Sequence, residues 1–128
     1  MNKFWALALV ALSLAGLAGC GGQNRDEREA DKITRAVISN DMAPVISDFD
    51  PAIKGEITRV RVAELSDELN QQGAYQGLKQ TTAAWCNRPG YLCFDVNFAK
   101  RPYHEVMKVG SDGKVQYWWI HAAQPQKT

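Results

Sequence analysis

The chain has 128 residues, enough for one domain, and its composition of 45% hydrophobic and 23% charged residues is ordinary for a globular protein. Fifteen lysines and arginines stand against 14 aspartates and glutamates, a formal net charge of +1. That balance excludes the basic excess typical of nucleic-acid binders and the charge imbalance of disordered tails. With only three cysteines and two histidines, we expect no metal, no cofactor and no nucleic-acid partner.

The first twenty residues have the pattern of an export signal. Lys3 precedes an apolar run over 4–17, which is 14 residues long and too short for a transmembrane helix of roughly 20 residues. The run ends in Leu-Ala-Gly-Cys at 17–20, which resembles the lipobox of bacterial lipoproteins. The resemblance implies cleavage after a signal peptide over 1–19 and lipidation of the Cys20 thiol.

A lipid on Cys20 predicts a membrane-anchored protein of the cell envelope, with a plain secretory signal and a chance cysteine as the alternative. Residue 21 is Gly, whereas Asp there resembles an inner-membrane retention signal. In a Gram-negative host this favours the outer membrane, facing the periplasm. The polar stretch after Cys20 predicts a flexible tether over 20–27, followed by one α+β domain over 28–122 and a polar C-terminal tail over 123–128.

Helical spacing of apolar residues predicts a first helix over 26–40. Asp41 is expected to cap a short second helix that has Val45, Ile46 and Phe49 on one face. The Asp-Pro pair at 50–51 has the pattern of the cap and first residue of another short helical piece.

The segment over 57–72 is ambiguous between helix and strand. Thr58 to Val62 alternates like a strand, but Val62, Leu65 and Leu69 have helical spacing and no Gly or Pro interrupts them. Because Gly73 supplies a C-terminal stop, we predict a helix from about Thr58 to Gln72.

From Leu78 onward the apolar period changes to two, which predicts four strands. The first is expected over 78–86. The other three each have one apolar face, made by Leu92, Phe94, Val96 and Phe98, by Tyr103, Glu105, Met107 and Val109, and by Val115, Tyr117 and Trp119. Helices followed by a strand meander indicate an α+β fold, with the N-terminal helices packed on a curved four-stranded antiparallel sheet.

The last hairpin has two alternative registers. A three-residue loop with Gly113 in the left-handed conformation pairs Val109 with Val115, Met107 with Tyr117 and Glu105 with Trp119. A two-residue Asp-Gly loop at 112–113 would instead pair Lys108 with Tyr117 and His104 with His121. We predict the first register because it groups the apolar side chains on one face.

Two cysteines remain beyond Cys20, and they flank six residues that include Pro89 and Gly90. With Pro-Gly as the turn, Cys86 and Cys93 are directly opposite across a hairpin, at a Cα separation within the disulfide range. We predict a disulfide in an exported chain, with two buried free thiols as the alternative. The Pro-Gly pair favours a turn that suits hairpins poorly, so a wider loop is the other geometry.

Aromatic side chains provide the candidate binding surface. Trp118 and Trp119 are adjacent, so on a strand they face opposite sides and only one points toward the helices. The other, with Trp85 or Tyr103, could form an exposed aromatic patch for a partner. The alternative is that a loop or the chain terminus covers it.

No metal-ligand cluster, phosphate-binding glycine loop or nucleophile–histidine spacing is present. The candidate catalytic groups are Glu105, the one acid on an apolar strand face, and Asp95 with His104. The ordinary interpretation is that Asp95 and His104 are solvated or capped strand residues, and that His121 lies near a strand end.

The order of helices and strands is similar to that of the cystatin-like domains of the nuclear-transport-factor-2-like superfamily. The resemblance is carried by Phe-Asp-Pro-Ala-Ile at 49–53, by Leu65 to Gly-Ala-Tyr at 73–75 and by the closing meander, and it covers about residues 28–121. It implies a sheet curved around a cone-shaped cavity. Ketosteroid isomerase-like enzymes of that superfamily carry an acid base inside the cone, whereas the inward faces here are hydrophobic except at Glu105.

These patterns predict an envelope lipoprotein with a non-catalytic domain that binds a protein partner, such as another envelope protein, or a small apolar ligand. One alternative is a small isomerase or hydrolase that uses Glu105 or Asp95 with His104. Others are a purely structural role and an inhibitor of a wall-acting enzyme.

Overall fold

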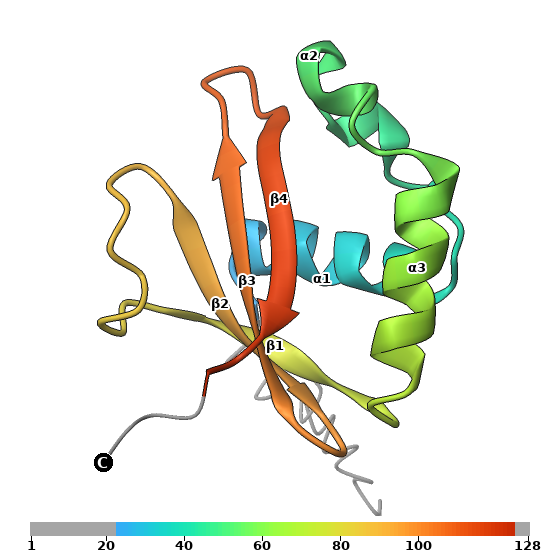
Figure 1. The fold of residues 1–128 in the computed structure, drawn as a ribbon. Coiled ribbons are helices and arrows are strands. Elements are labelled where there is room, and N and C mark those ends of the chain that lie inside the picture. The colour runs from blue at the N-terminus through green and yellow to red at the C-terminus, as the bar shows by residue number, and fades with distance from the viewer. Residues whose placement is uncertain (1–22, 125–128) are drawn as a thin grey trace, which may run out of the picture.

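The computed structural model describes residues 23–124, so the predicted signal peptide, the lipidated Cys20 and most of the C-terminal tail lie outside the described residues. Helices precede an antiparallel sheet of strand order β1-β2-β3-β4 (Figure 1). The predicted α+β fold is confirmed. The elements are α1 (Arg25–Ile38), a 3₁₀ turn (Ile46–Asp48), α2 (Pro51–Lys54), α3 (Arg59–Asn70), β1 (Tyr75–Thr81), β2 (Leu92–Phe98), β3 (Pro102–Val109) and β4 (Val115–Ala122).

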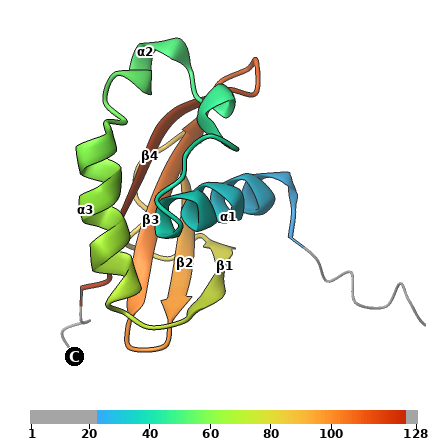
Figure 2. The same ribbon diagram turned by 90° about the vertical axis from the view of Figure 1, so that its right-hand side faces the viewer.

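The helices gather on one side of the sheet, which we call the inner face, and α1 crosses that face (Figure 2). Asn24 caps α1 by accepting a hydrogen bond from the backbone N–H of Glu27 at 2.8 Å. The apolar stripe of α1, centred on Ile33 and Val37, is buried against the sheet. The predicted first helix is therefore confirmed; the chain leaves it just before Asn40, which has a left-handed φ of 51°.

The two following helices also agree with the prediction: the cap expected at Asp50 forms, and Thr58, the predicted start of the next helix, is its cap. The Asp50 carboxylate accepts the N–H of Ala52 at the start of α2, and the Thr58 hydroxyl accepts the N–H of Arg61 at the start of α3. The helical interpretation of 57–72 is thus confirmed. The helix predicted after Asp41 is shorter than expected and consists of the 3₁₀ turn alone.

The first strand was predicted too late in the sequence. Its observed bounds are Tyr75–Thr81, with a bulge between Tyr75 and Gly77. The strand ends where the Thr81 hydroxyl accepts the N–H of Ala83 at 3.1 Å, which turns the chain out of the sheet. The predicted residues 82–86 therefore belong to the β1–β2 loop, whose local turn chemistry outweighs their strand-like pattern.

The core lies between α1 and the inner face of the sheet. Phe94, Val96 and Met107 are fully buried there, which confirms the predicted inward faces of β2 and β3. On the outer face, one cross-strand row joins Lys79, Asp95, His104 and His121 in register. The two faces of the sheet therefore differ sharply in polarity.

The register predicted for the last hairpin is correct only for its first pair. Val109 pairs with Val115, but a bulge at Gln116 follows, so that Tyr117 pairs with Lys108 and all later pairs have the alternative register. Gly113 has the predicted left-handed φ of 82°. Beyond the bulge the predicted faces of β4 are exchanged, because one extra residue turns the strand over.

The exchange places Trp118 and Ile120 on the inner face, where they pair with Met107 and Glu105. Tyr117 and Trp119 move to the outer face. Burial explains why the second register is adopted beyond the bulge. Ile120 is 1% exposed there and replaces Trp119 as the neighbour of Glu105.

Cys86 and Cys93 form a disulfide with a Cα separation of 5.9 Å, so the predicted bond is confirmed. Of the two geometries considered for it, the tight Pro-Gly hairpin is wrong and the wider loop is observed. The cross-strand neighbour of Cys93 is Thr81, and Cys86 lies within the loop, outside any strand. The disulfide joins this wider loop to the start of β2.

Candidate functional site

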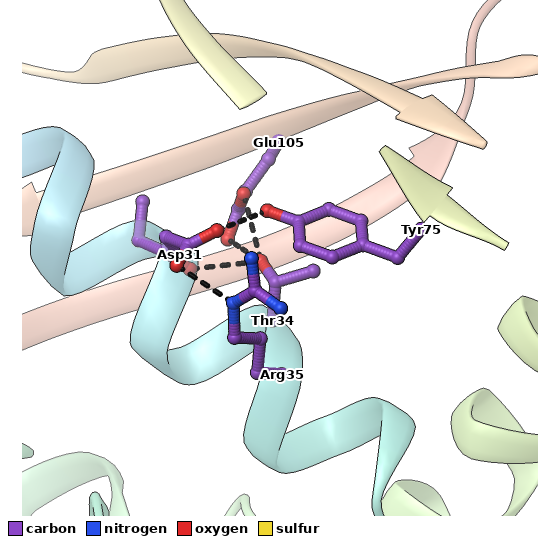
Figure 3. A network of polar contacts seen from close by, with 6 residues as sticks. Asp31, Thr34, Arg35, Tyr75 and Glu105 are labelled. Carbon is purple, nitrogen blue, oxygen red and sulfur yellow. Dashed lines mark hydrogen bonds and ion pairs between the residues drawn. The ribbon is translucent and has the colours of Figure 1, made fainter. Parts of the chain in front are cut away.

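Glu105 is the buried acid of the inner face, with no solvent exposure. Its carboxyl lies between α1 and β4, because Thr34 of α1 and the indole N–H of Trp118 both contact it. Burial raises the pKa of Glu105 to about 8, while the Trp118 and Thr34 contacts favour the charged form and lower it. Figure 3 shows the carboxyl meeting Thr34 beside a second polar group, Asp31.

Proton counting explains how this carboxyl is accommodated. Thr34 Oγ1 lies 2.8 Å from the Ala30 carbonyl oxygen and 3.1 Å from Glu105 Oε2. A hydroxyl has a single proton to donate. When Glu105 is ionised, Thr34 donates to its carboxylate. When Glu105 is protonated, it donates to Thr34, and Thr34 is then free to donate to Ala30. Glu105 Oε1 accepts from Trp118 in both states. One proton on Glu105 satisfies all the groups, so the neutral form fits the site.

The neighbouring cluster of Asp31, Tyr75 and Arg35 is polar and only partly buried. The Tyr75 hydroxyl donates to Asp31 Oδ1 at 2.6 Å, and Arg35 Nε donates to Asp31 Oδ2 at 2.9 Å (Figure 3). The Asp31 charge adds to the raised pKa of Glu105. Each acid thus has its own partners, and this cluster joins α1 to β1.

Asp95 and His104 lie on the outer face and are neighbours there. His104 Nε2 is 3.8 Å from Asp95 Oδ1, which is beyond hydrogen-bond distance. Trp85 from the β1–β2 loop stacks on the imidazole, with ring centroids 3.8 Å apart and an interplanar angle of 5°. Burial lowers the pKa of His104, His121 lowers it further, and Asp95 opposes the shift.

The three candidate catalytic residues are therefore divided between two faces. Glu105 and His104 are consecutive on β3 and point in opposite directions. Trp85 covers His104, and Glu105 is sealed within the core. The structure brings Asp95 and His104 together but keeps Glu105 apart from both.

The four candidate patch aromatics do not form one surface. Tyr103 is 1% exposed and donates its hydroxyl proton to Glu68 Oε1 at 3.0 Å. Trp85 is on the outer face over His104. Trp118 and Trp119, by contrast, both border one pocket.

That pocket, which we call the β4 groove, runs between β4 and the α2–α3 segment. Its volume is about 310 Å³, which is within the range of small-ligand sites. Apolar side chains dominate the walls, and polar groups are few. The lining residues are Val37, Met42, Phe49, Ile53, Glu56, Ile57, Arg61, Val62, Leu65 and 116–119.

Arg61 is the cation of the β4 groove. Its guanidinium lies 5.2 Å from the ring centroid of Trp119, in a cation–π contact. Within residues 23–124, Arg61 has no carboxylate oxygen within 4.0 Å. The groove can therefore hold an apolar group and place an anionic group near Arg61.

Sequence reasoning missed the helical wall of this groove. Ile53, Ile57 and Leu65 were recognised only as helical or connecting residues. Their half-buried state depends on how α2 and α3 stand away from β4. The sequence of α3 contained one usable signal for this wall. Its apolar stripe is short and does not include Val60, which is 66% exposed.

Comparisons with protein-family models, with curated proteins and with solved structures found no match. Over residues 23–124, no helix has the length and apolar character needed to cross a membrane. The same part of the chain contains no group of three or more His, Cys, Asp or Glu residues placed to hold a metal ion.

Proposed function

We propose that the protein is an envelope lipoprotein, anchored through Cys20, whose domain is a non-catalytic binding module for an apolar group. The observation that carries the proposal is the β4 groove, an apolar pocket of about 310 Å³ with few polar groups. The Leu-Ala-Gly-Cys sequence at 17–20 supports the anchor.

The position of the groove favours a ligand on the side away from the anchor. α1 begins at Arg25, five residues after Cys20, whereas Val37 near its other end lines the groove. Twelve residues of α-helix span roughly 18 Å. An attachment at Cys20 would therefore leave the groove free to meet a ligand or another envelope protein.

The anchor is tested by the intact mass of the protein purified from its native membrane, with thiol alkylation before and after reduction. A mass that lacks residues 1–19 and carries acyl chains, with two more alkylations after reduction, is the expected result. An unlipidated Cys20 would refute the anchor.

The groove is tested with 1-aminoanthracene, an uncharged fluorescent probe. We expect saturable binding that Ile57→Trp abolishes, because the larger side chain fills the groove. Ala84→Trp adds the same side chain to the exposed β1–β2 loop and should leave binding unchanged. Equal binding by both variants would contradict the proposal.

A further inference from the structure

The two edges of the sheet are protected to different degrees. An edge strand offers unpaired backbone groups to any added strand, and proteins usually block it with bulges and charges. β1 has a bulge near Gly77 and carries Lys79. β4 contains no Asp, Glu, Lys, Arg or Pro between Val115 and Ala122, and its bulge is confined to its start.

A short internal segment already pairs with the beginning of the β4 edge. Phe49 bridges Val115 in the parallel direction, and the Asp50 N–H donates to the Val115 carbonyl at 2.8 Å. Pro51 then starts α2, which turns the chain away. Within residues 23–124, no hydrogen bond outside the sheet reaches the backbone of 116–122. The outward backbone groups of these residues have no protein partner there.

The unpaired edge runs beside the β4 groove. The two most exposed large apolar side chains of the described residues are Val60 at 66% and Trp119 at 40%. They belong to α3 and β4, the elements that form the two walls. Exposed apolar surface at a free edge is typical of a site for a partner.

We propose that this edge binds an extended peptide segment of a partner protein by strand addition, with alternate apolar side chains entering the β4 groove. Backbone hydrogen bonds to 117–121 would supply affinity, and the groove would select the side chains. A carboxylate in the peptide would pair with Arg61, whose guanidinium has no acidic partner in the described residues. The inference rests on the proposed function, because it names the ligand class for the same groove.

The test uses a library of seven-residue peptides with apolar residues at alternate positions and one glutamate between them. The tightest binder is then synthesised in two forms. In each form, the backbone N–H groups along one edge of the extended peptide are methylated, and those along the other edge are left free. The side chains are the same in both forms, but only one form can donate hydrogen bonds to β4. We expect one form to bind at least about tenfold more weakly than the other, as the loss of several backbone hydrogen bonds requires.

Hydrogen–deuterium exchange provides a second measurement on the protein itself. Binding of the unblocked peptide should slow exchange of backbone amides within 117–121. Trp119→Lys should weaken peptide binding at least about tenfold, because it places a charge on the edge. Thr81→Lys is the matched control, since Thr81 and Trp119 end the same cross-strand row on opposite edges.

Three outcomes would overturn the inference. In the first, both N-methylated forms bind equally, so that side chains alone enter the groove. In the second, selection on the wild-type protein enriches no library peptide beyond selection on the Trp119→Lys variant, while 1-aminoanthracene still binds. That result leaves the proposed function standing. In the third, neither peptides nor 1-aminoanthracene bind, so that both proposals fail.

Discussion

The two faces of the sheet hold their ionisable groups in opposite ways. The inner face encloses Glu105 completely and satisfies it with Thr34 and Trp118. The outer face leaves Asp95 half exposed and covers His104 with Trp85. Burial raises the pKa of the acid and lowers that of the imidazole, so each group is pushed toward its neutral form.

The comparison shows that an identical physical cause gives opposite pH dependence. Neutral Glu105 keeps a proton that the unfolded chain releases, whereas neutral His104 lacks one that the unfolded chain binds. The inner face should therefore lose stability as pH rises, and the outer face should lose it as pH falls. Four changes would test this contrast.

Glu105→Ala should have the largest effect, a loss of about 3 kcal/mol in the free energy of unfolding. It leaves a cavity and removes the acceptor of the Trp118 indole N–H. Glu105→Gln should not lower the free energy of unfolding at pH 7, because its amide donates to Thr34, its oxygen accepts from Trp118, and it has no proton that the unfolded chain would release. Urea denaturation at pH 7 measures both. A Gln variant as unstable as the Ala variant would mean that Glu105 is ionised.

Removing the disulfide should have the next largest effect, on the outer face. Replacing Cys86 and Cys93 by alanine is expected to lower stability by roughly 2–3 kcal/mol, the usual contribution of a short covalent ring. The reduced wild-type protein should show the same loss. Urea denaturation with and without reductant provides the measurement, and an unchanged midpoint would contradict it.

The third change is pH across the titration range of Glu105. The folded pKa of about 8 exceeds the ordinary value of 4.5. The contribution of Glu105 to the free energy of unfolding is therefore fully present below pH 4.5. It is lost as pH rises to about 8, by at most about 1.4 kcal/mol per pH unit. Stability relative to Glu105→Gln should fall over this range. A constant difference between the two proteins would show that Glu105 titrates normally.

The smallest effect is expected at His104. Its folded pKa is below 6.5, so its contribution is present above pH 6.5 and is lost as pH falls through the folded pKa. His104→Phe keeps a ring against Trp85 but cannot be protonated. Wild-type protein should lose stability relative to this variant between pH 7 and pH 5, followed by urea denaturation. The opposite sign would mean that Asp95 dominates.

Local sequence signals predicted most of the fold. Asp50 and Thr58 lie where the predicted helices begin, and strict alternation identified the inward residues of β2 and β3. Periodicity sufficed there because each element buries one face and one face only. The same alternation predicts Glu105 as an acid on an apolar face, and the structure buries it there.

The errors occurred where long-range packing chose between local alternatives. The bulge at Gln116 combines both hairpin registers. Val115 and Ile120 are both buried, but they are an odd number of positions apart, so strict alternation would place them on opposite faces. The extra residue of the bulge lets both face inward. The β4 groove depends on the distance between α3 and β4, which no local pattern records. Predicting it requires the packing of helix side chains that are far apart in the sequence.

The disulfide has a consequence for proteolysis of the β1–β2 loop. Residues 87–90 lie between Cys86 and Cys93 in an exposed stretch, so a protease of broad specificity is expected to cut there, whereas a trypsin-like protease is not, because Pro89 follows Arg88. Such a cut opens the covalent ring without separating the two pieces of chain. Nicked and intact molecules would then migrate together on a non-reducing gel and separate only after reduction. The loop can thus be severed while the strands on both sides stay joined.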